Sequence, residues 1–283
     1  MFSDIITFDF LRHTFLTGLL IGIIAPLLGS FLVVRRLSLL ADALSHVTLA
    51  GIAFGLFIEK QFLITFSPLY SGMGFSIIGA VLIEKLRSLY KAYQEIGIPI
   101  ILSGGVGLSV IFIALANGFN TDLFGFLFGS VSAVTVNDLY LISAISIFVI
   151  LAIVLFYKEL LTLSFDEEHA TVSGIHSKRI HFLFIVLTAL VIAASIRIVG
   201  VLLVSALMTL PVAAAMRLAK SFKQLIFLSI VLAEFSVITG LISGYYANIP
   251  PGGTIVVISI IVLILSFFWN KVTLKQHKGD RVS

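Results

Sequence analysis

Two ionisable residues, Asp42 and His46, lie four positions apart in an otherwise apolar stretch. At this spacing both side chains project from the same face of a helix. A carboxylate and a neutral imidazole supply the oxygen and nitrogen ligands that bind a divalent transition metal such as zinc. Two ligands do not complete a site, so a structural alternative stays open, in which Asp42 caps a helix and His46 donates to a nearby carbonyl.

Glu234 is an ionisable residue in the middle of another apolar run. A carboxylate inside a bilayer is costly, and this makes it a candidate for function. We therefore take Glu234 as a candidate third ligand beside Asp42 and His46. The alternative for Glu234 is a neutral carboxyl group that joins two helices.

Other polar residues receive structural roles. Arg197 follows an apolar run, where snorkelling to the membrane interface is the expected explanation, ahead of pairing with an acidic residue. The acidic residues considered for that pairing are Asp122, Asp138 and Glu59. The spacing of His169, His176 and His181 matches no zinc-site pattern, so we expect surface histidines.

The segment between residues 158 and 181 contains seven charged residues. At its centre Asp166, Glu167 and Glu168 precede Ala170 and Gly174. The acids complement the positive end of a helix dipole, and the glycine permits a left-handed end, so we predict a short helix here. Such a helix suits docking to another protein, and a solvated loop is the alternative.

The composition places these residues in a membrane protein. Of the 283 residues, 59% are hydrophobic and 11% are charged, against about 25% charged in an ordinary soluble domain. Continuous apolar runs favour helices over a β-barrel. We therefore expect an all-α polytopic protein, with residues 1–283 forming a single domain in the lipid bilayer.

Nine runs approach the roughly 20 apolar residues that a helix needs to cross a bilayer. They are Thr14–Val34, Leu39–Ile58, Phe62–Ile83, Ile96–Asn117, Leu139–Tyr157, Phe182–Ile196, Val199–Met216, Leu225–Ser243 and Thr254–Trp269. The sixth and seventh are short and are separated only by a break at Arg197–Gly200. The segment Gly118–Asp138 is expected to be an outer loop that dips back as a short helix.

The distribution of basic residues predicts the orientation. With nine spans and a cytoplasmic C-terminus, 15 of the 18 Lys and Arg residues fall on the cytoplasmic side. Only Arg12, Lys60 and Arg197 remain at the outer side. This bias obeys the positive-inside rule and places the N-terminus outside.

Several classes of chemistry are excluded by absent residues or motifs. The chain has no cysteine, which excludes disulfides and thiolate metal sites. It has no G-x-x-x-x-G-K-[ST], H-E-x-x-H or G-x-S-x-G motif, which argues against nucleotide hydrolysis and the commonest membrane hydrolases. The small net charge of +4 follows membrane topology, so no nucleic-acid partner is expected.

Three segments resemble one known family. The first runs from Gly29 to Ala53 and contains Leu40-Ala-Asp-Ala-Leu-Ser-His46. The others are Val199–Pro211 and Ser243–Gly253. Together they resemble the membrane permeases of metal-cation ABC importers, the zinc and manganese uptake family, over nearly the whole chain. The resemblance implies a type II-like ABC importer permease in the cell membrane of a prokaryote.

The resemblance also implies the partners and the site. Such permeases work with a cytoplasmic ABC ATPase and an extracytoplasmic metal-binding protein, and two copies line a central path. ATP hydrolysis belongs to the separate subunit, so this chain is not an enzyme. The resemblance supports Asp42 and His46 in the metal pathway, and Glu234 less directly. It also makes the segment from Asp166 to Gly174 resemble the helix that couples the permease to its ATPase.

We therefore expect the permease subunit of a divalent-metal importer that transports Zn²⁺ and holds no permanent cofactor. The manganese branch of the family tends to have proline where this chain has Ala50, which favours zinc. A manganese or iron importer of the same family is the first alternative. A proton-coupled secondary carrier centred on Glu234 and a membrane-embedded metalloenzyme are the others.

Overall fold

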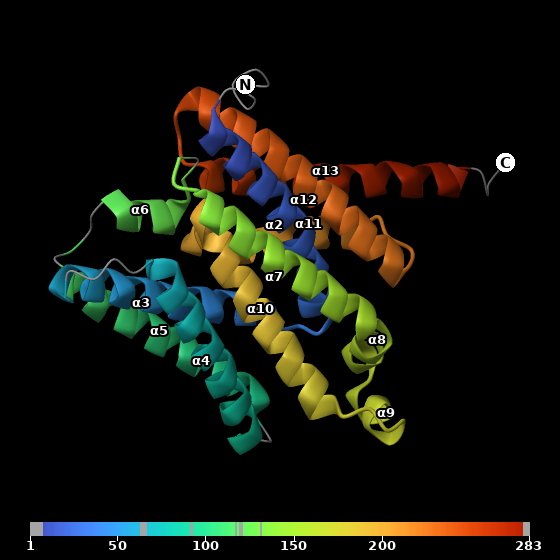
Figure 1. Ribbon diagram of the computed structural model, residues 1–283. Coiled ribbons are helices and arrows are strands. Elements are labelled where there is room, and N and C mark those ends of the chain that lie inside the picture. The colour runs from blue at the N-terminus through green and yellow to red at the C-terminus, as the bar shows by residue number, and fades with distance from the viewer. Residues whose placement is uncertain are drawn as a thin grey trace.

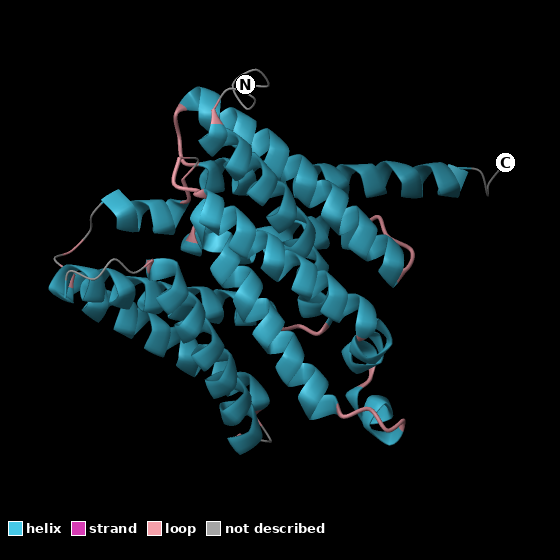
Figure 2. Cartoon of the chain, in the orientation of Figure 1, coloured by secondary structure: helices cyan, strands magenta, loops and turns pink. Residues whose placement is uncertain are grey.

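The computed structural model describes residues 8–62, 67–90, 93–116, 118, 121–130 and 132–279. Within these ranges every regular element is a helix, as expected from the continuous apolar runs (Figures 1 and 2). The longer helices are α2 (Asp9–Val34), α3 (Ser38–Phe62), α4 (Pro68–Leu89), α5 (Gly97–Leu115), α7 (Val136–Leu155), α10 (Ser177–Val199), α11 (Val201–Met216), α12 (Phe222–Ala247) and α13 (Pro251–Gly279). The shorter ones are η1 (Gln94–Ile96), α6 (Thr121–Phe128), α8 (Tyr157–Phe165) and α9 (Glu167–Val172).

Each of the nine predicted apolar runs corresponds to one of the longer helices. Eight helices of the described chain are long and apolar enough to cross a membrane, and α11 is a shorter apolar helix of 16 residues. Several boundaries differ from the prediction. Val199 ends α10 instead of beginning the seventh run, and Ile96 belongs to η1 instead of beginning the fourth. Phe62 ends α3 instead of beginning the next span, and Tyr157 begins α8 instead of ending α7. Residues 63–66 and Asn117, included in the predicted spans, lie outside the described ranges.

The helices run between two ends of the bundle (Figure 1). We name these the α6 end, which holds α6 and the junction of α10 with α11, and the α9 end, which holds α8, α9 and the link from α2 to α3. Helix α6 lies in the segment where a short helix was predicted. The two ends matter because each carries a separate group of charged residues.

Helix α11 connects the two ends despite its length. It begins after Gly200, a single residue with φ of +85° that separates it from α10. A Cβ atom on Gly200 would overlap the backbone of Leu127 and Gly129 at the α6 end. The other end of α11, at Val212 and Ala215, belongs to an apolar cluster at the α9 end. The seventh predicted run is therefore a complete helix of the bundle.

Helix α3 is held on several sides by closely packed neighbours. It packs against α4, α5, α10 and α11. A Cβ atom on Gly105 of α5 would lie 2.8 Å from the backbone nitrogen of Val47. On another side, a Cβ atom on Gly51 would lie 2.7 Å from the carbonyl oxygen of Ser71 in α4. Small residues allow such close approach between membrane helices, and here they fix the orientation of the helix that carries Asp42 and His46.

Candidate metal pathway and its two ends

The sequence pair Asp42 and His46 lies on one face of α3, and both residues are half-buried. Because α3 begins at Ser38, Asp42 is inside the helix, so the capping role in the structural alternative is wrong. The carboxylate oxygen Oδ1 of Asp42 accepts a long hydrogen bond of 3.5 Å from the hydroxyl of Ser205 in α11. A partner at this distance leaves much of the carboxylate available to a cation.

Helix α11 presents a partly open stripe that the sequence reading did not single out. Its incompletely buried residues recur at helical spacing, and they include Leu202, Ser205, Ala206, Thr209 and Ala213. Two of them carry hydroxyl groups in an otherwise apolar helix, which is the signal that could have found them. Helices α3 and α11 pack together, and the hydroxyl of Ser205 lies beside the carboxylate of Asp42.

Glu234 does not join this pair. It lies on α12, which packs against α2, α11 and α13. A Cβ atom on Gly22 of α2 would lie 2.7 Å from Oε1 of Glu234, so the carboxylate faces α2. Both carboxylate oxygens are buried without a hydrogen-bond partner in the described part of the chain. Its place in the metal pathway stays a prediction.

The predicted metal ligands of one copy of the chain do not gather into a complete site. Among the described residues, no group of three or more His, Cys, Asp or Glu side chains could together hold a metal ion. A structural zinc site uses four ligands, and an open site keeps positions for exchange. The two side chains on α3 are fewer than a closed site uses, and their place in a metal pathway stays a prediction.

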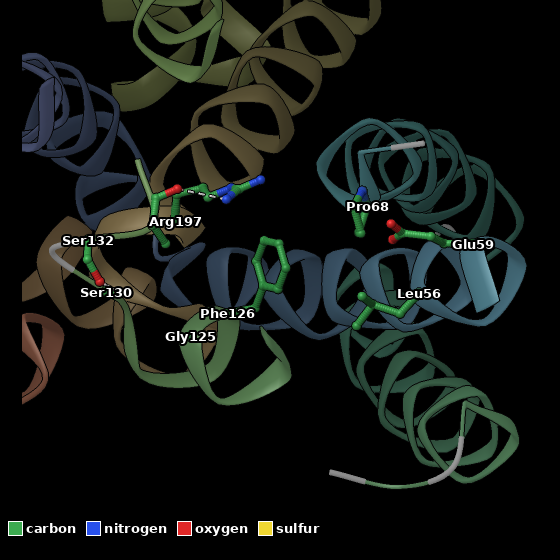
Figure 3. Close-up of a pocket in the computed structure, with 9 residues that line it drawn as sticks. Leu56, Glu59, Pro68, Gly125, Phe126, Ser130, Ser132 and Arg197 are labelled. Atoms are coloured by element: carbon green, nitrogen blue, oxygen red, sulfur yellow. Dashed lines mark hydrogen bonds between the residues drawn. The ribbon is translucent and has the colours of Figure 1, made fainter. Parts of the chain in front are cut away.

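The α6 end contains a pocket of about 380 Å³. Figure 3 shows Glu59 of α3 on one side and Arg197 of α10 on the other, with Phe126 of α6 between them. Leu56, Pro68, Gly125, Ser130, Ser132 and Ala133 complete its lining. The pocket is open and combines charged, hydroxyl and apolar groups, which distinguishes it from the lipid-facing surfaces.

Arg197 is paired rather than snorkelling, so the expectation from the sequence is wrong. Its Nη1 donates to the carbonyl oxygen of Ala133 at 2.9 Å, and its Nε lies 3.7 Å from Oδ2 of Asp138 (Figure 3 shows the hydrogen bond). The guanidinium also lies 5.0 Å from the ring centre of Phe126. Asp138 is fixed in turn by a capping box with Thr135. Of the other proposed partners, Glu59 lies across the pocket and the side chain of Asp122 is outside the described set.

The α9 end carries the predicted charged helix. Helix α9 spans Glu167–Val172, and the carboxylate of Asp166 caps it by accepting from the backbone of His169 at 2.8 Å. Gly174 follows with φ of +85°, as its predicted left-handed role requires. Ala170 is buried, whereas Glu167 and Glu168 are exposed. The local helix is thus confirmed, and its partner remains to be inferred.

A buried polar network lies at the same end, and the sequence reading missed it. His181 of α10 is 3% exposed, so the expectation of a surface histidine is wrong. Arg35, in the link after α2, contacts Nδ1 of His181 at 2.5 Å, and Nε2 lies 3.4 Å from Glu84 of α4. Because a guanidinium only donates, Nδ1 accepts and Nε2 carries the hydrogen. Burial, and secondarily Arg87, lowers the pKa of Arg35 to about 10.

Comparison with known proteins gives this arrangement a context. Residues 7–270 match the ABC 3 transport family, designated ABC-3. The chain belongs to the ABC 3 transport family. It is a multi-pass membrane permease subunit of a metal ABC importer and is not itself an enzyme. Membership of this family excludes the two alternatives of a proton-coupled secondary carrier and a membrane-embedded metalloenzyme.

Two named relatives of this ABC-3 permease differ in their metal. The chain is 34% identical to the manganese import system permease protein ScaB of Streptococcus gordonii, over 92% of this chain and 91% of that protein. It is 30% identical to the high-affinity zinc uptake system membrane protein ZnuB of Haemophilus influenzae, over 92% of this chain and 98% of the relative. Metal-ion transport is therefore shared, and the identity of the ion is not decided by these names.

A solved structure supports the fold of the ABC-3 permease. It is PsaBC from Streptococcus pneumoniae in complex with Fab, with a TM-score of 0.80 and 31% sequence identity. The match covers 94% of this chain and 95% of that one.

We expect His181→Ala to destabilise the α9 end by about 1–3 kcal/mol, because a buried guanidinium then loses its acceptor. Thermal unfolding of the purified permease would measure the change. His176→Ala is the matched control, since this exposed histidine lies five residues earlier. Equal unfolding temperatures for His181→Ala and His176→Ala would contradict a stabilising role for the network.

Proposed function

We propose that the chain imports divalent transition-metal ions, with zinc as the preferred ion, along a path lined by Asp42 and His46. The half-buried pair on α3 carries this proposal, because it offers a carboxylate beside the Ser205 hydroxyl and an imidazole one turn further along the same face, without enclosing them. Relatives named as zinc and manganese permeases support the same class of ion. An incomplete ligand set suits transport, since an ion held by four protein ligands would leave slowly.

A homodimer of permeases would complete the path. Each copy provides one carboxylate and one imidazole from α3, and the described part of one copy holds no group of three metal-binding side chains. Two copies related by a two-fold axis would present two of each to a shared path. Closed two-fold symmetry is the commonest arrangement of protein oligomers.

In the proposed orientation, the α6 end faces outward and the α9 end faces the cytoplasm. This follows the distribution of basic residues in the sequence. A metal-binding protein outside would deliver the ion near the pocket that contains Glu59 and Arg197. At the other end, Asp166, Glu167, Glu168, Ala170 and Gly174 would form the contact with a cytoplasmic ABC ATPase.

The preference for zinc rests on Ala50. In a helix the backbone N–H of residue 50 donates to the carbonyl oxygen of His46. The manganese branch of the family tends to have proline at this position, and a proline has no N–H and would free that oxygen. Manganese favours oxygen ligands more than zinc does. Ala50 lies within the continuous helix α3, so His46 offers its imidazole while its carbonyl stays within the helix.

We also propose that Glu234 is a second position along the path, away from Asp42 and His46. Its two buried carboxylate oxygens have no partner in the described structure. They are therefore available to a cation or a proton moving beside α2. This role differs from that of Asp42 and His46, because the three residues do not form one cluster.

Replacing His46 with Ala, or Asp42 with Asn, should reduce metal uptake by at least about tenfold, because each change removes a proposed ligand. The measurement is uptake of radioactive ⁶⁵Zn by cells that express the complete importer. Asp9→Asn, at an exposed carboxylate near the start of α2, controls for loss of charge. Normal uptake with correctly assembled His46→Ala protein would overturn the proposed path.

Replacing Ala50 with Pro should move the preference from zinc towards manganese, because it frees the His46 carbonyl oxygen. Competition uptake with both ions gives the ratio, which is insensitive to the amount of folded protein. Ala50→Gly loosens the helix but keeps the N–H, so it should leave the ratio unchanged. A ratio that moves equally in both variants would show that helix flexibility, and not the carbonyl oxygen, sets the preference.

Replacing Glu168 with Lys should weaken the ATPase contact and uncouple ATP hydrolysis from transport. Glu168 is exposed on α9, so the permease should unfold at its normal temperature. Metal uptake and ATPase activity of the purified complex are the measurements. Glu95→Lys changes another exposed acid, on η1 outside α9, and should remain coupled. If ATP hydrolysis and transport remain coupled in Glu168→Lys, α9 is a solvated segment and not the contact with the ATPase.

A further inference from the structure

An apolar groove lies on the bundle between α7 and α12. Both helices pack against α2, and Ile23 and Leu27 of α2 form its floor. Ile150 and Val154 line the α7 side, and Ile226 lines the α12 side. The groove has a volume of about 550 Å³ and is open along its length. It is separate from the α3 pair and from the pocket at the α6 end.

The groove is polar at only one end. Lys223, near the start of α12, and Tyr157, at the start of α8, line it there. The ring of Tyr157 lies 6.4 Å from that of Phe31 and 6.4 Å from that of Phe222, measured between ring centres. These contacts limit the positions of the Tyr157 ring. The rest of the lining is aliphatic, so a bound molecule must have a long apolar part and a polar end.

The position of the groove within membrane-spanning helices restricts what can fill it. An aliphatic lining offers water no hydrogen-bond partners, whereas the surrounding bilayer supplies hydrocarbon chains. The charge at the end is a lysine ammonium, which attracts anionic lipid headgroups. A tyrosine hydroxyl beside it is a second donor for phosphate oxygens.

We propose that this groove binds one anionic phospholipid. An acyl chain lies along Ile150, Val154 and Ile226, over the floor formed by Ile23 and Leu27. The phosphate group lies at Lys223 and Tyr157. The proposal does not depend on which metal ion the permease transports, because none of these residues belongs to the proposed path.

Lipid binding to the purified permease complex tests the proposal. Phosphatidylglycerol and phosphatidylcholine with identical acyl chains are added, and native mass spectrometry measures their apparent affinities. We expect the wild type to prefer phosphatidylglycerol by about fivefold, which corresponds to one lysine near an anionic surface. Lys223→Ala should remove the preference. Lys220→Ala, at an exposed lysine outside the groove, should keep it.

A second set of variants tests the apolar part. Ile226→Trp and Ile150→Phe fill the groove from opposite walls, so each should weaken binding of both lipids. The Lys220→Ala control should bind both lipids as the wild type does. Equal losses in Lys223→Ala and Lys220→Ala would overturn the proposal in favour of diffuse surface charge. Filled variants that bind lipid normally but no longer form dimers would overturn it in favour of a second copy of the chain as the occupant.

Discussion

The close approach of helix backbones around α3 is the constraint on which the proposed site depends. Inside a bilayer, association of helices gains little from the hydrophobic effect, so packing geometry carries more of the stability. Gly105 lets α5 approach the backbone at Val47, and Gly51 lets α4 approach on another side. With two sides of α3 fixed, the face carrying Asp42 and His46 has its polar neighbour in α11. The same residues on a loosely packed helix could rotate away from Ser205.

The elements of the fold were predictable because a bilayer permits few solutions. Continuous apolar runs of spanning length must form helices, since every backbone group has to be satisfied within its own segment. Each of the nine predicted runs is a helix in the structure. The short helix after Asp166 was predictable as well, because a cap, a helix dipole and a glycine are local features. The start of α4 at Pro68 was not, since the apolar pattern of the sequence continues without a break after Phe62.

Partners of buried charges were harder to predict because they depend on packing between distant segments. Arg197 meets Ala133 and Asp138, about 60 residues earlier, and nothing near Arg197 in the sequence encodes this choice. The capping pattern at Thr135 and Asp138 was readable, but it does not show that Asp138 also faces an arginine. His181 was mistaken for a surface residue because its helix begins at Ser177, four residues before it. Similarly, nothing in the sequence around Glu234 shows that its carboxylate packs against Gly22 of α2.

The single-residue connection at Gly200 has a mechanical consequence. One residue contributes only two freely rotating backbone torsions, so α10 and α11 can change their mutual angle but cannot slide apart. Helix α10 contacts the buried network through His181 near its beginning and the pocket at the α6 end through Arg197 near its end. Helix α11 carries Ser205 beside Asp42. A displacement of the end of α10 is therefore passed to the start of α11, because one residue leaves no slack in the chain to absorb it.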